Sequence, residues 1–273
     1  MVRSSFALTL ACALISTAVN AHEVWIEPQD WQLPEGSDIA AQVLNGEEFR
    51  GQMLSWQPRA IKRAEKWEGD SSSALSGRLG DIPAISASAQ TDSLLTLLYE
   101  TNHNTVTYEA YEKFTSFLNE KGFERVIAEH AGRNLPREGI KEAYSRHAKA
   151  LVAVGAGQGA DAPRGMVIEL VALDNPYTSD TAAPLRFQVF YEGAVLPQNR
   201  VTLFDKAPDG AVVTTFGQSD AEGIVAFEVT EGHTYLVDTV MIRPTSRDLL
   251  IQTRGAVWES LWASLTFQVP AAR

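Results

Sequence analysis

The stretch RVTLFDKAPDGAVVTTFGQSDAEGIVAFEVTEGHTYLVDTVMI (residues 200–242) decides the fold, because it repeats one pattern four times. Short runs rich in Val, Ile, Thr and aromatic residues cover residues 200–204, 212–216, 224–229 and 234–242. Such residues favour β-strands, and Gly, Asp and Pro between the runs favour turns. The stretch therefore predicts consecutive strands of a β sandwich.

Two more runs, 185–191 and 262–269, extend this pattern to six strands and predict a carboxy-terminal β sandwich over residues 184–273. One connection, Asp220-Ala221-Glu222-Gly223, is acidic enough to suggest calcium. It lacks the alternating acidic residues and the terminal Glu of a helix-flanked calcium loop, so a glycine-assisted turn is the preferred interpretation.

The amino-terminal half has a mixed pattern. Residues 22–57 alternate apolar and polar positions between turn residues, which predicts antiparallel strands. Helical spacing then favours a helical segment over 108–152, made of a helix that starts at Tyr108 and stops at Gly122, a helix at 124–131, and a third at 137–152. The third prediction rests on an apolar stripe at Ile140, Tyr144, Ala148 and Leu151.

The fold class predicted from these patterns is mainly β with a helical insertion, in two β-sandwich-like domains. An amino-terminal β domain would cover residues 22–174, and a turn-rich linker near 174–183 would separate it from the second domain.

The first 21 residues predict a cleavable signal peptide. Arg3 supplies a basic start, residues 6–15 an apolar stretch too short to span a bilayer, and Val19 and Ala21 the small residues of a cleavage site. The only cysteine, Cys12, lies in this segment, so the mature chain has no thiol or disulfide. We therefore expect a periplasmic protein with no membrane span in its mature chain.

The net charge of the protein limits the classes of partner that it is expected to bind. The formal net charge of the full sequence is −11, and removing the signal peptide removes Arg3 and makes it −12. An acidic protein is not expected to bind nucleic acid, and mildly attracts cations.

Cleavage after Ala21 would place His22 at the new amino terminus, where its α-amino nitrogen and its imidazole can chelate one metal ion. A second imidazole is usually needed to hold copper. His103, between Asn102 and Asn104 just after a predicted strand, is the preferred second ligand. The other imidazoles belong to His130, His147 and His233, and His147 is expected to point into the interior.

The sequence gives little support for catalysis. It contains no Gly-x-Ser-x-Gly elbow, no His-Glu-x-x-His motif and no phosphate-binding Gly-Lys-Ser/Thr loop. Tryptophans at positions 56, 67, 258 and 262 could form a sugar-binding platform, but packing in the core is the preferred interpretation.

Four segments together resemble a known family. They are AHEVWIEP (21–28), YSRHAKALV (144–152), Glu169-Leu170 and WESLWASLTF (258–267). The chain resembles the bacterial periplasmic family called domain of unknown function 4198, which is often described as linked to nickel or cobalt uptake. The resemblance implies an exported protein whose second domain is similar to prealbumin-type or carboxypeptidase-regulatory modules, and it implies that His22 is tied to a metal. It departs at Val240-Met241, where relatives often have a histidine.

The leading hypothesis is a non-catalytic periplasmic protein that binds nickel, cobalt or copper through His22 and His103. It would serve metal uptake or homeostasis by passing the ion to a membrane transport or envelope protein. Two alternatives stay open: a metal-independent adhesion or scaffold module of the cell envelope, and a copper oxidase that uses an amino-terminal histidine.

Overall fold

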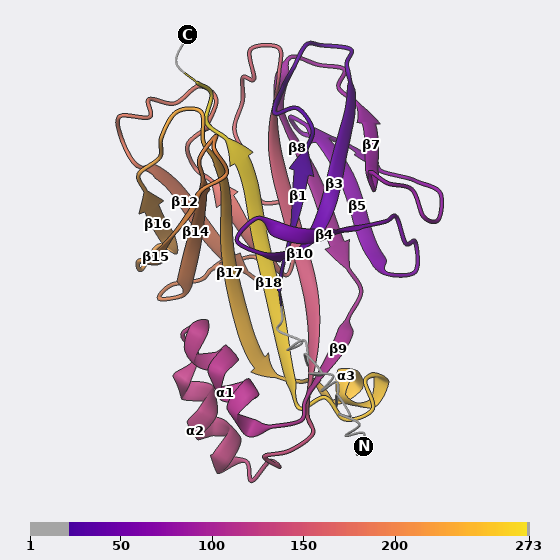
Figure 1. Ribbon diagram of the computed structural model, residues 1–273, viewed down its shortest axis with the longest axis vertical. Helices are drawn as coiled ribbons and strands as arrows, with labels where there is room; N and C mark the ends of the chain where they lie inside the picture. The colour runs from indigo at the N-terminus through magenta and orange to yellow at the C-terminus, as the bar shows by residue number, and fades with distance from the viewer. Residues whose placement is uncertain (1–21, 272–273) are drawn as a thin grey trace, which may run out of the picture.

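The computed structural model describes residues 22–271, and its centre is a ten-stranded sheet with a four-stranded sheet packed on each face (Figure 1). From one edge to the other, the central sheet contains β15 (Val212–Gln218), β14 (Arg200–Lys206), β17 (Thr234–Pro244), β18 (Trp258–Gln268), β10 (Ile140–Val154), β8 (Ser93–Thr101), β5 (Ile61–Glu68) and β6 (Ser71–Ala74), with β2 (Gln32–Leu33) and β9 (Asn104–Tyr108) also paired to β10. The predicted class, mainly β with few helices, is confirmed.

The two outer sheets are smaller. The first contains β1 (Glu23–Pro28), β3 (Asp38–Glu47), β4 (Arg50–Leu54) and β7 (Ile85–Ser88). The second contains β11 (Ile168–Ala172), β12 (Leu185–Tyr191), β13 (Ala194–Val195) and β16 (Ile224–Phe227). All six strands predicted between residues 185 and 269 are present: β12 and β16 in this second outer sheet, and β14, β15, β17 and β18 in the central sheet.

Alternate residues of β10 serve two different cores, because successive side chains of a strand point to opposite faces. Ala148, Ala150 and Val152 pack with the first outer sheet. Leu151 packs with the second. β10 is therefore covered on both sides, which no edge or surface strand would be.

The helix predicted over 137–152 is wrong, since these residues form most of β10. The helical segment predicted over 108–152 is reduced to α1 (Tyr111–Glu120) and α2 (Glu124–Gly132). The physical reason is that every residue from Ser145 to Val154 is buried. A strand buried on both faces does not alternate between apolar and polar residues, so apolar residues also occur at helical spacing. The alanines of β10 add a misleading helical propensity.

The two predicted domains share one hydrogen-bonded sheet. β10 runs parallel to β18, with the register running from Glu142 opposite Trp258 to Ala150 opposite Thr266. β10 lies in the predicted first domain and β18 in the predicted second, so strand pairing continues across the expected boundary.

The helices cover the same face of the central sheet as the first outer sheet, at the other end of the molecule (Figure 1). Phe117 of α1 stacks on Trp262 of β18, with 5.8 Å between ring centroids. Gly122 ends α1 with a φ of 79°, the left-handed stop expected from the sequence. A short third helix, α3 (Arg247–Gln252), precedes β18.

A buried ion cluster joins β10 to β11. The Lys149 ammonium lies 2.8 Å from Asp161 Oδ1 and 3.2 Å from Glu169 Oε1, and all three side chains are almost fully inaccessible to solvent. Glu169 also accepts hydrogen bonds from the backbone N–H groups of Arg164 and Met166. Each buried charge in this cluster therefore has partners, as buried charges require.

Within residues 22–271, no helix combines the length and the apolar composition of a bilayer-spanning segment. The predicted signal peptide, residues 1–21, lies outside the described residues.

Candidate functional site

A pocket of about 1160 Å³ lies between the β3–β4 hairpin and the central sheet. In Figure 1 this hairpin overlaps the central sheet, and its Leu44 and Phe49 pack with Phe204 of β14 and Leu236 of β17. The pocket brings His22, at the start of the described chain, together with Arg146 of β10. Its other lining residues are Val24, Asn45, Gly46, Glu47, Glu48, Arg50, Gly51, Gln52, Met53, Leu54, Ser55, Gln57, Ala60, Tyr99, Thr101, Asn104, Val106 and Tyr144.

His22 lies at this pocket beside a carboxylate. Strand β1 pairs with β3 in a register that sets Glu23 opposite Gly46, and the next position along puts His22 level with Glu47. The His22 Nδ1 atom is 3.1 Å from Glu47 Oε1, and both side chains are partly exposed. The imidazole is thus held by backbone register and one charged partner, and solvent can reach it.

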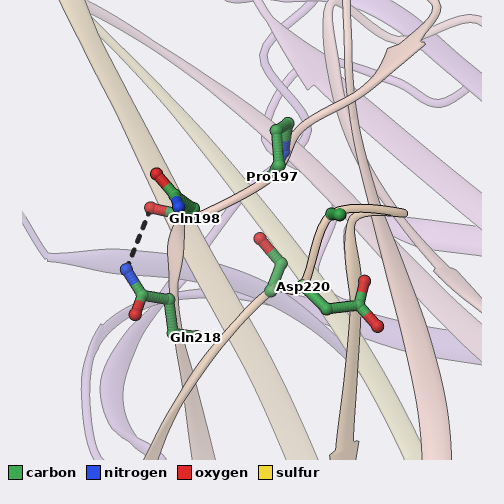
Figure 2. Close-up of a pocket in the computed structure, with 6 residues that line it drawn as sticks. Pro197, Gln198, Gln218 and Asp220 are labelled. Carbon is green, nitrogen blue, oxygen red and sulfur yellow. Dashed lines mark hydrogen bonds between the residues drawn. The ribbon is translucent and has the colours of Figure 1, made fainter.

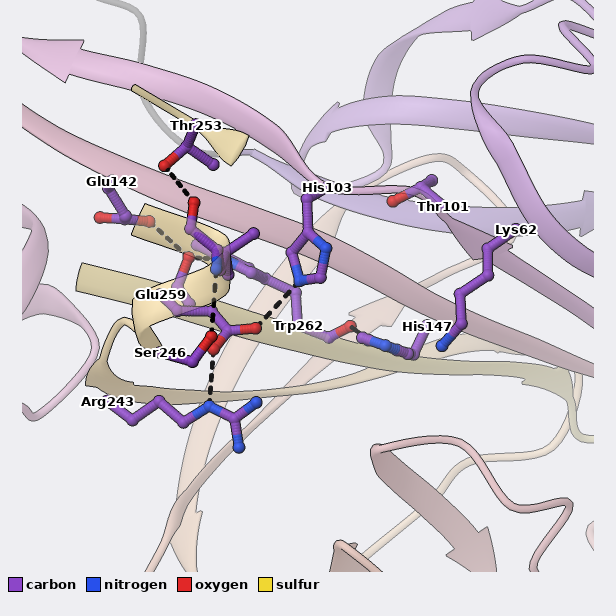
Figure 3. A network of polar contacts seen from close by, with 12 residues as sticks. Lys62, Thr101, His103, Glu142, His147, Arg243, Ser246, Thr253, Glu259 and Trp262 are labelled. Atoms are coloured by element: carbon purple, nitrogen blue, oxygen red, sulfur yellow. Dashed lines mark hydrogen bonds and ion pairs between the residues drawn. The ribbon is translucent and has the colours of Figure 1, made fainter. Parts of the chain in front are cut away.

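His103, the predicted second ligand, contacts a different carboxylate. Its Nε2 atom lies 2.9 Å from Glu259 Oε1, while Arg243 Nε donates to Glu259 Oε2 at 2.7 Å (Figure 3). Burial raises the pKa of Glu259, but the hydrogen bonds from His103 and Arg243 outweigh it and hold this pKa below its usual range. His103 does not line the pocket that holds His22, so the structure does not bring the two predicted ligands together there.

The remaining histidines are engaged in internal contacts. His147 is buried, as predicted, and donates from Nδ1 to the Trp262 carbonyl at 3.1 Å, while burial lowers its pKa to about 3. His130 accepts from Trp258 Nε1 and donates to the Pro136 carbonyl. His233 Nδ1 lies 2.7 Å from Asp205 Oδ1. Within residues 22–271, no group of three or more His, Cys, Asp or Glu side chains is arranged to hold a metal ion.

A cluster of buried charges adjoins the pocket. Lys121 of α1's carboxyl end donates to Glu23 Oε1 at 2.7 Å and lies 4.0 Å from Asp238 Oδ2. Burial raises the pKa of Asp238 to about 7, against the opposing charges of Lys121 and Arg146. The Arg146 guanidinium lies over the ring of Trp262, its partner across the β10–β18 pair, at 4.2 Å, and over Tyr144 at 4.7 Å.

Sequence reasoning missed this cluster, because its members come from β1, the end of α1, β10 and β17. No spacing along the chain marks them as neighbours. The available signal was that Glu23 and Arg146 both lie inside segments that carry the family resemblance.

The raised pKa of the buried Glu142 predicts how the stability of the protein depends on pH. This fully buried carboxyl accepts hydrogen bonds from Tyr108 Oη and Ser260 Oγ, and burial raises its pKa to about 7 from an ordinary value of 4.5. The folded protein therefore binds more protons than the unfolded chain between these two values, so stability falls as pH rises through this window. We expect Glu142→Gln, which stays neutral, to lessen this fall by up to about 1.4 kcal/mol per pH unit.

The measurement is urea denaturation at pH 5, 6, 7 and 8. The exposed Glu138→Gln, in the loop before β10, is the control and should follow the parent protein. An unchanged slope in Glu142→Gln would mean that Glu142 does not take up a proton on folding. Asp238, whose pKa is raised in the same direction, should leave part of the slope in both proteins.

A second pocket, of about 560 Å³, lies at the acidic turn considered for calcium (Figure 2). Asp220 Oδ1 accepts from the backbone N–H groups of Glu222 at 3.0 Å and Ile224 at 2.8 Å. Gly223 follows with a φ of 74°, which favours glycine. The carboxylate is occupied in shaping a turn before β16, in agreement with the preferred interpretation.

Comparison with known proteins places the chain in a family. A family model described as "Domain of unknown function (DUF4198)" matches residues 19–243. The chain belongs to the DUF4198 family. The family resemblance inferred from four short segments is confirmed, and the DUF4198 match includes His22, Arg146 and Asp238. No curated protein matches this DUF4198 chain.

Solved structures offer only distant likenesses to this DUF4198 chain. The tetra-tandem repeat in the extending region of a large adhesion protein is 11% identical, with 91% of this chain and 50% of that chain covered and a TM-score of 0.20. A DUF4785 family protein from Legionella pneumophila is 9% identical, with 79% and 51% covered and a TM-score of 0.23. The chain spans about half the length of each, and at these TM-scores neither likeness bears on function.

Proposed function

We propose that the protein is exported to the periplasm and binds one transition-metal ion, nickel, cobalt or copper, at the amino terminus created by cleavage after Ala21. In this proposal it passes the ion to a membrane transport or envelope protein and catalyses no reaction. The observation that carries the proposal is the 3.1 Å contact between His22 Nδ1 and Glu47 Oε1 at an open pocket.

That separation suits two donors on one metal ion. Donors about 2.1 Å from an ion and about 90° apart lie about 3 Å from each other. The ion would sit between His22 Nδ1 and Glu47 Oε1, and the free α-amino group of His22 would close a chelate. Two nitrogens and one carboxylate oxygen form a donor set that suits borderline cations. Glu47 takes the place that the sequence hypothesis gave to His103, whose Nε2 contacts Glu259.

The test is isothermal titration of the protein that begins at His22 with copper(II), nickel(II) and cobalt(II). We expect one-to-one binding of at least one ion. We expect the affinity to fall by about 100-fold or more in His22→Ala and in a form with one extra residue before His22, since each loses a donor of the chelate. Glu47→Gln should weaken binding less, by about tenfold.

His233→Ala is the matched control, because His233 is also a partly exposed histidine paired with a carboxylate, Asp205. It should bind the ion like the parent protein. Equal losses in His233→Ala and His22→Ala would contradict an amino-terminal site. Absence of binding in every form would favour the metal-independent envelope scaffold, whereas turnover of a reductant with oxygen by the copper-loaded protein would favour the oxidase.

A further inference from the structure

A third pocket, of about 680 Å³, lies where the turn between α1 and α2 meets β14 and β15 at the edge of the central sheet. It shares no lining residue with the pocket at His22. Lys121, Arg125 and Arg200 line it, and among residues 22–271 no Asp or Glu does. The full sequence has 34 acidic and 23 basic residues, so a pocket lined only by cations is an exception on this protein. Such a pocket is expected to attract anions.

Arg200 supplies a cation without a partner. Its guanidinium lies over the Phe216 ring at 4.1 Å, and its Cδ and Nη1 atoms lie 3.2 Å and 3.7 Å from the position that a Cβ would take on Gly122. The side chain is therefore held between two residues that line the pocket. Among residues 22–271 it forms no salt bridge, and its nitrogens donate no hydrogen bond. None of these nitrogens is among the enclosed polar atoms that lack a partner, so solvent reaches each of them.

The other two cations differ in how far they are neutralised. The Lys121 ammonium is occupied by the buried carboxylates described above. Arg125 is exposed, and its contacts with Glu129 Oε2 at 3.8 Å and with the Ile242 carbonyl at 3.4 Å are long for hydrogen bonds. Two guanidinium groups, those of Arg125 and Arg200, can therefore serve an anion, which favours an anion with two negative charges.

Apolar side chains form much of the remaining wall. Phe123, Leu196 and Met241 line the pocket, and the ring of Phe216 beside Arg200 is 55% exposed. The volume of the pocket lies within the range typical of small-molecule sites. A ligand with an organic body would therefore bury apolar surface here in addition to meeting the guanidinium groups.

We propose that this pocket binds a small organic molecule that carries a phosphate group, with Arg200 as its main donor. A phosphate monoester carries close to two negative charges at pH 7, and guanidinium N–H groups form short, charge-assisted hydrogen bonds with its oxygens. A single carboxylate brings only one charge to two guanidinium groups. Inorganic phosphate has the charge but no organic body for the apolar wall.

The experiment is calorimetric titration of the protein, freed of metal on a chelating resin and kept in phosphate-free buffer, with phenyl phosphate, inorganic phosphate and benzoate. We expect saturable one-to-one binding of phenyl phosphate. Inorganic phosphate should bind at least about tenfold more weakly because it lacks the ring. Benzoate should also bind at least about tenfold more weakly, because it carries a single charge.

Arg200→Gln should weaken the binding of phenyl phosphate by about tenfold or more, since it removes the unpaired charge and its donors. Arg133→Gln is the matched control. The Arg133 guanidinium also lies over an aromatic ring, that of Trp258 at 4.6 Å, but outside this pocket. It removes the same charge from the protein and should bind phenyl phosphate like the parent protein.

A carboxylate placed in the pocket provides a second test. Gln218 donates to the Gln198 carbonyl at 3.3 Å, on the rim that this pocket shares with the acidic turn (Figure 2). Gln218→Glu should therefore repel phenyl phosphate and weaken its binding by about threefold or more. Thr215→Glu adds the same charge to β15 on the opposite face of the strand, and should leave binding unchanged.

Absence of saturable phenyl phosphate binding, or equal affinity for benzoate or inorganic phosphate, would overturn the assignment. So would unchanged affinity in Arg200→Gln, or a loss in either control variant as large as that in its pocket counterpart. None of these readouts uses metal affinity, so this inference and the metal site fail or succeed separately.

Discussion

Replacing Lys149 with Met is expected to destabilise the protein by about 3–5 kcal/mol at pH 7. The methionine side chain has nearly the same length and volume, so packing around β10 changes little. The substitution removes the only cation within hydrogen-bond reach of Asp161 and Glu169 among the salt bridges of residues 22–271. Two carboxylates would then stay buried near each other without a compensating charge, which is among the largest single-residue penalties known.

The pH dependence of this loss identifies its cause. Lowering the pH from 7 to 5 should shrink the difference between Lys149→Met and the parent protein, because an orphaned buried carboxyl can be neutralised by a proton. Adding Asp161→Asn and Glu169→Gln to Lys149→Met should recover part of the stability at pH 7. Urea denaturation gives both numbers.

Lys206→Met is the matched control. Lys206 pairs with Glu27 at 2.8 Å, but about a quarter of each side chain is exposed. Its loss should cost less than about 1 kcal/mol. A similar loss of stability in Lys149→Met and Lys206→Met would show that burial does not govern how much the ion cluster contributes to stability.

Replacing Trp262 with Ala is expected to cost about 3–5 kcal/mol of stability. The indole is buried between the central sheet and α1, where it stacks on Phe117 and lies beneath Lys121, 4.9 Å from the ring centroid. Removing it leaves a cavity in the core and takes away the surface on which α1 rests.

Hydrogen exchange distinguishes the local effect from the global one. In Trp262→Ala, amides of α1 should exchange faster, relative to those of the β10–β18 pair, than they do in the parent protein. Phe216→Ala removes an aromatic ring that is 55% exposed, and should change stability by less than about 1 kcal/mol. A cost below about 1 kcal/mol for Trp262→Ala would mean that the helices do not depend on this ring.

The strands between residues 185 and 269 could be predicted because each is a short run rich in β-branched residues and turn residues separate one run from the next. The helices α1 and α2 could be predicted because one face packs on the sheet and the other is solvated, which leaves a helical period in the sequence. β10 could not be recognised, because burial on both faces removes the period that would identify a strand. The strand pairing between the two predicted domains was not expected for the same reason, because β10 is the strand that pairs with β18 across their boundary.

For the candidate site, the sequence pointed to His22, but its carboxylate neighbour was not predicted. Glu47 meets His22 only through the register of β1 and β3, and strand register depends on turn geometry and on which face is buried. The contact of Arg146 with Trp262 was equally hidden, because these two residues meet only through the parallel register of β10 and β18.

The position of β18 also bears on how the chain folds. β18 is a central strand, paired with β10 and β17, and its Ser264 and Thr266 hydroxyls donate to the Val24 and Ile26 carbonyls of β1. These contacts join residues 240 positions apart, so forming them costs the loop-closure entropy of nearly the whole described chain. A nascent chain that ends before Trp258 lacks β18, so the edges of β10 and β17 that pair with this strand have no partner. The central sheet can therefore be completed only after β18 has been synthesised.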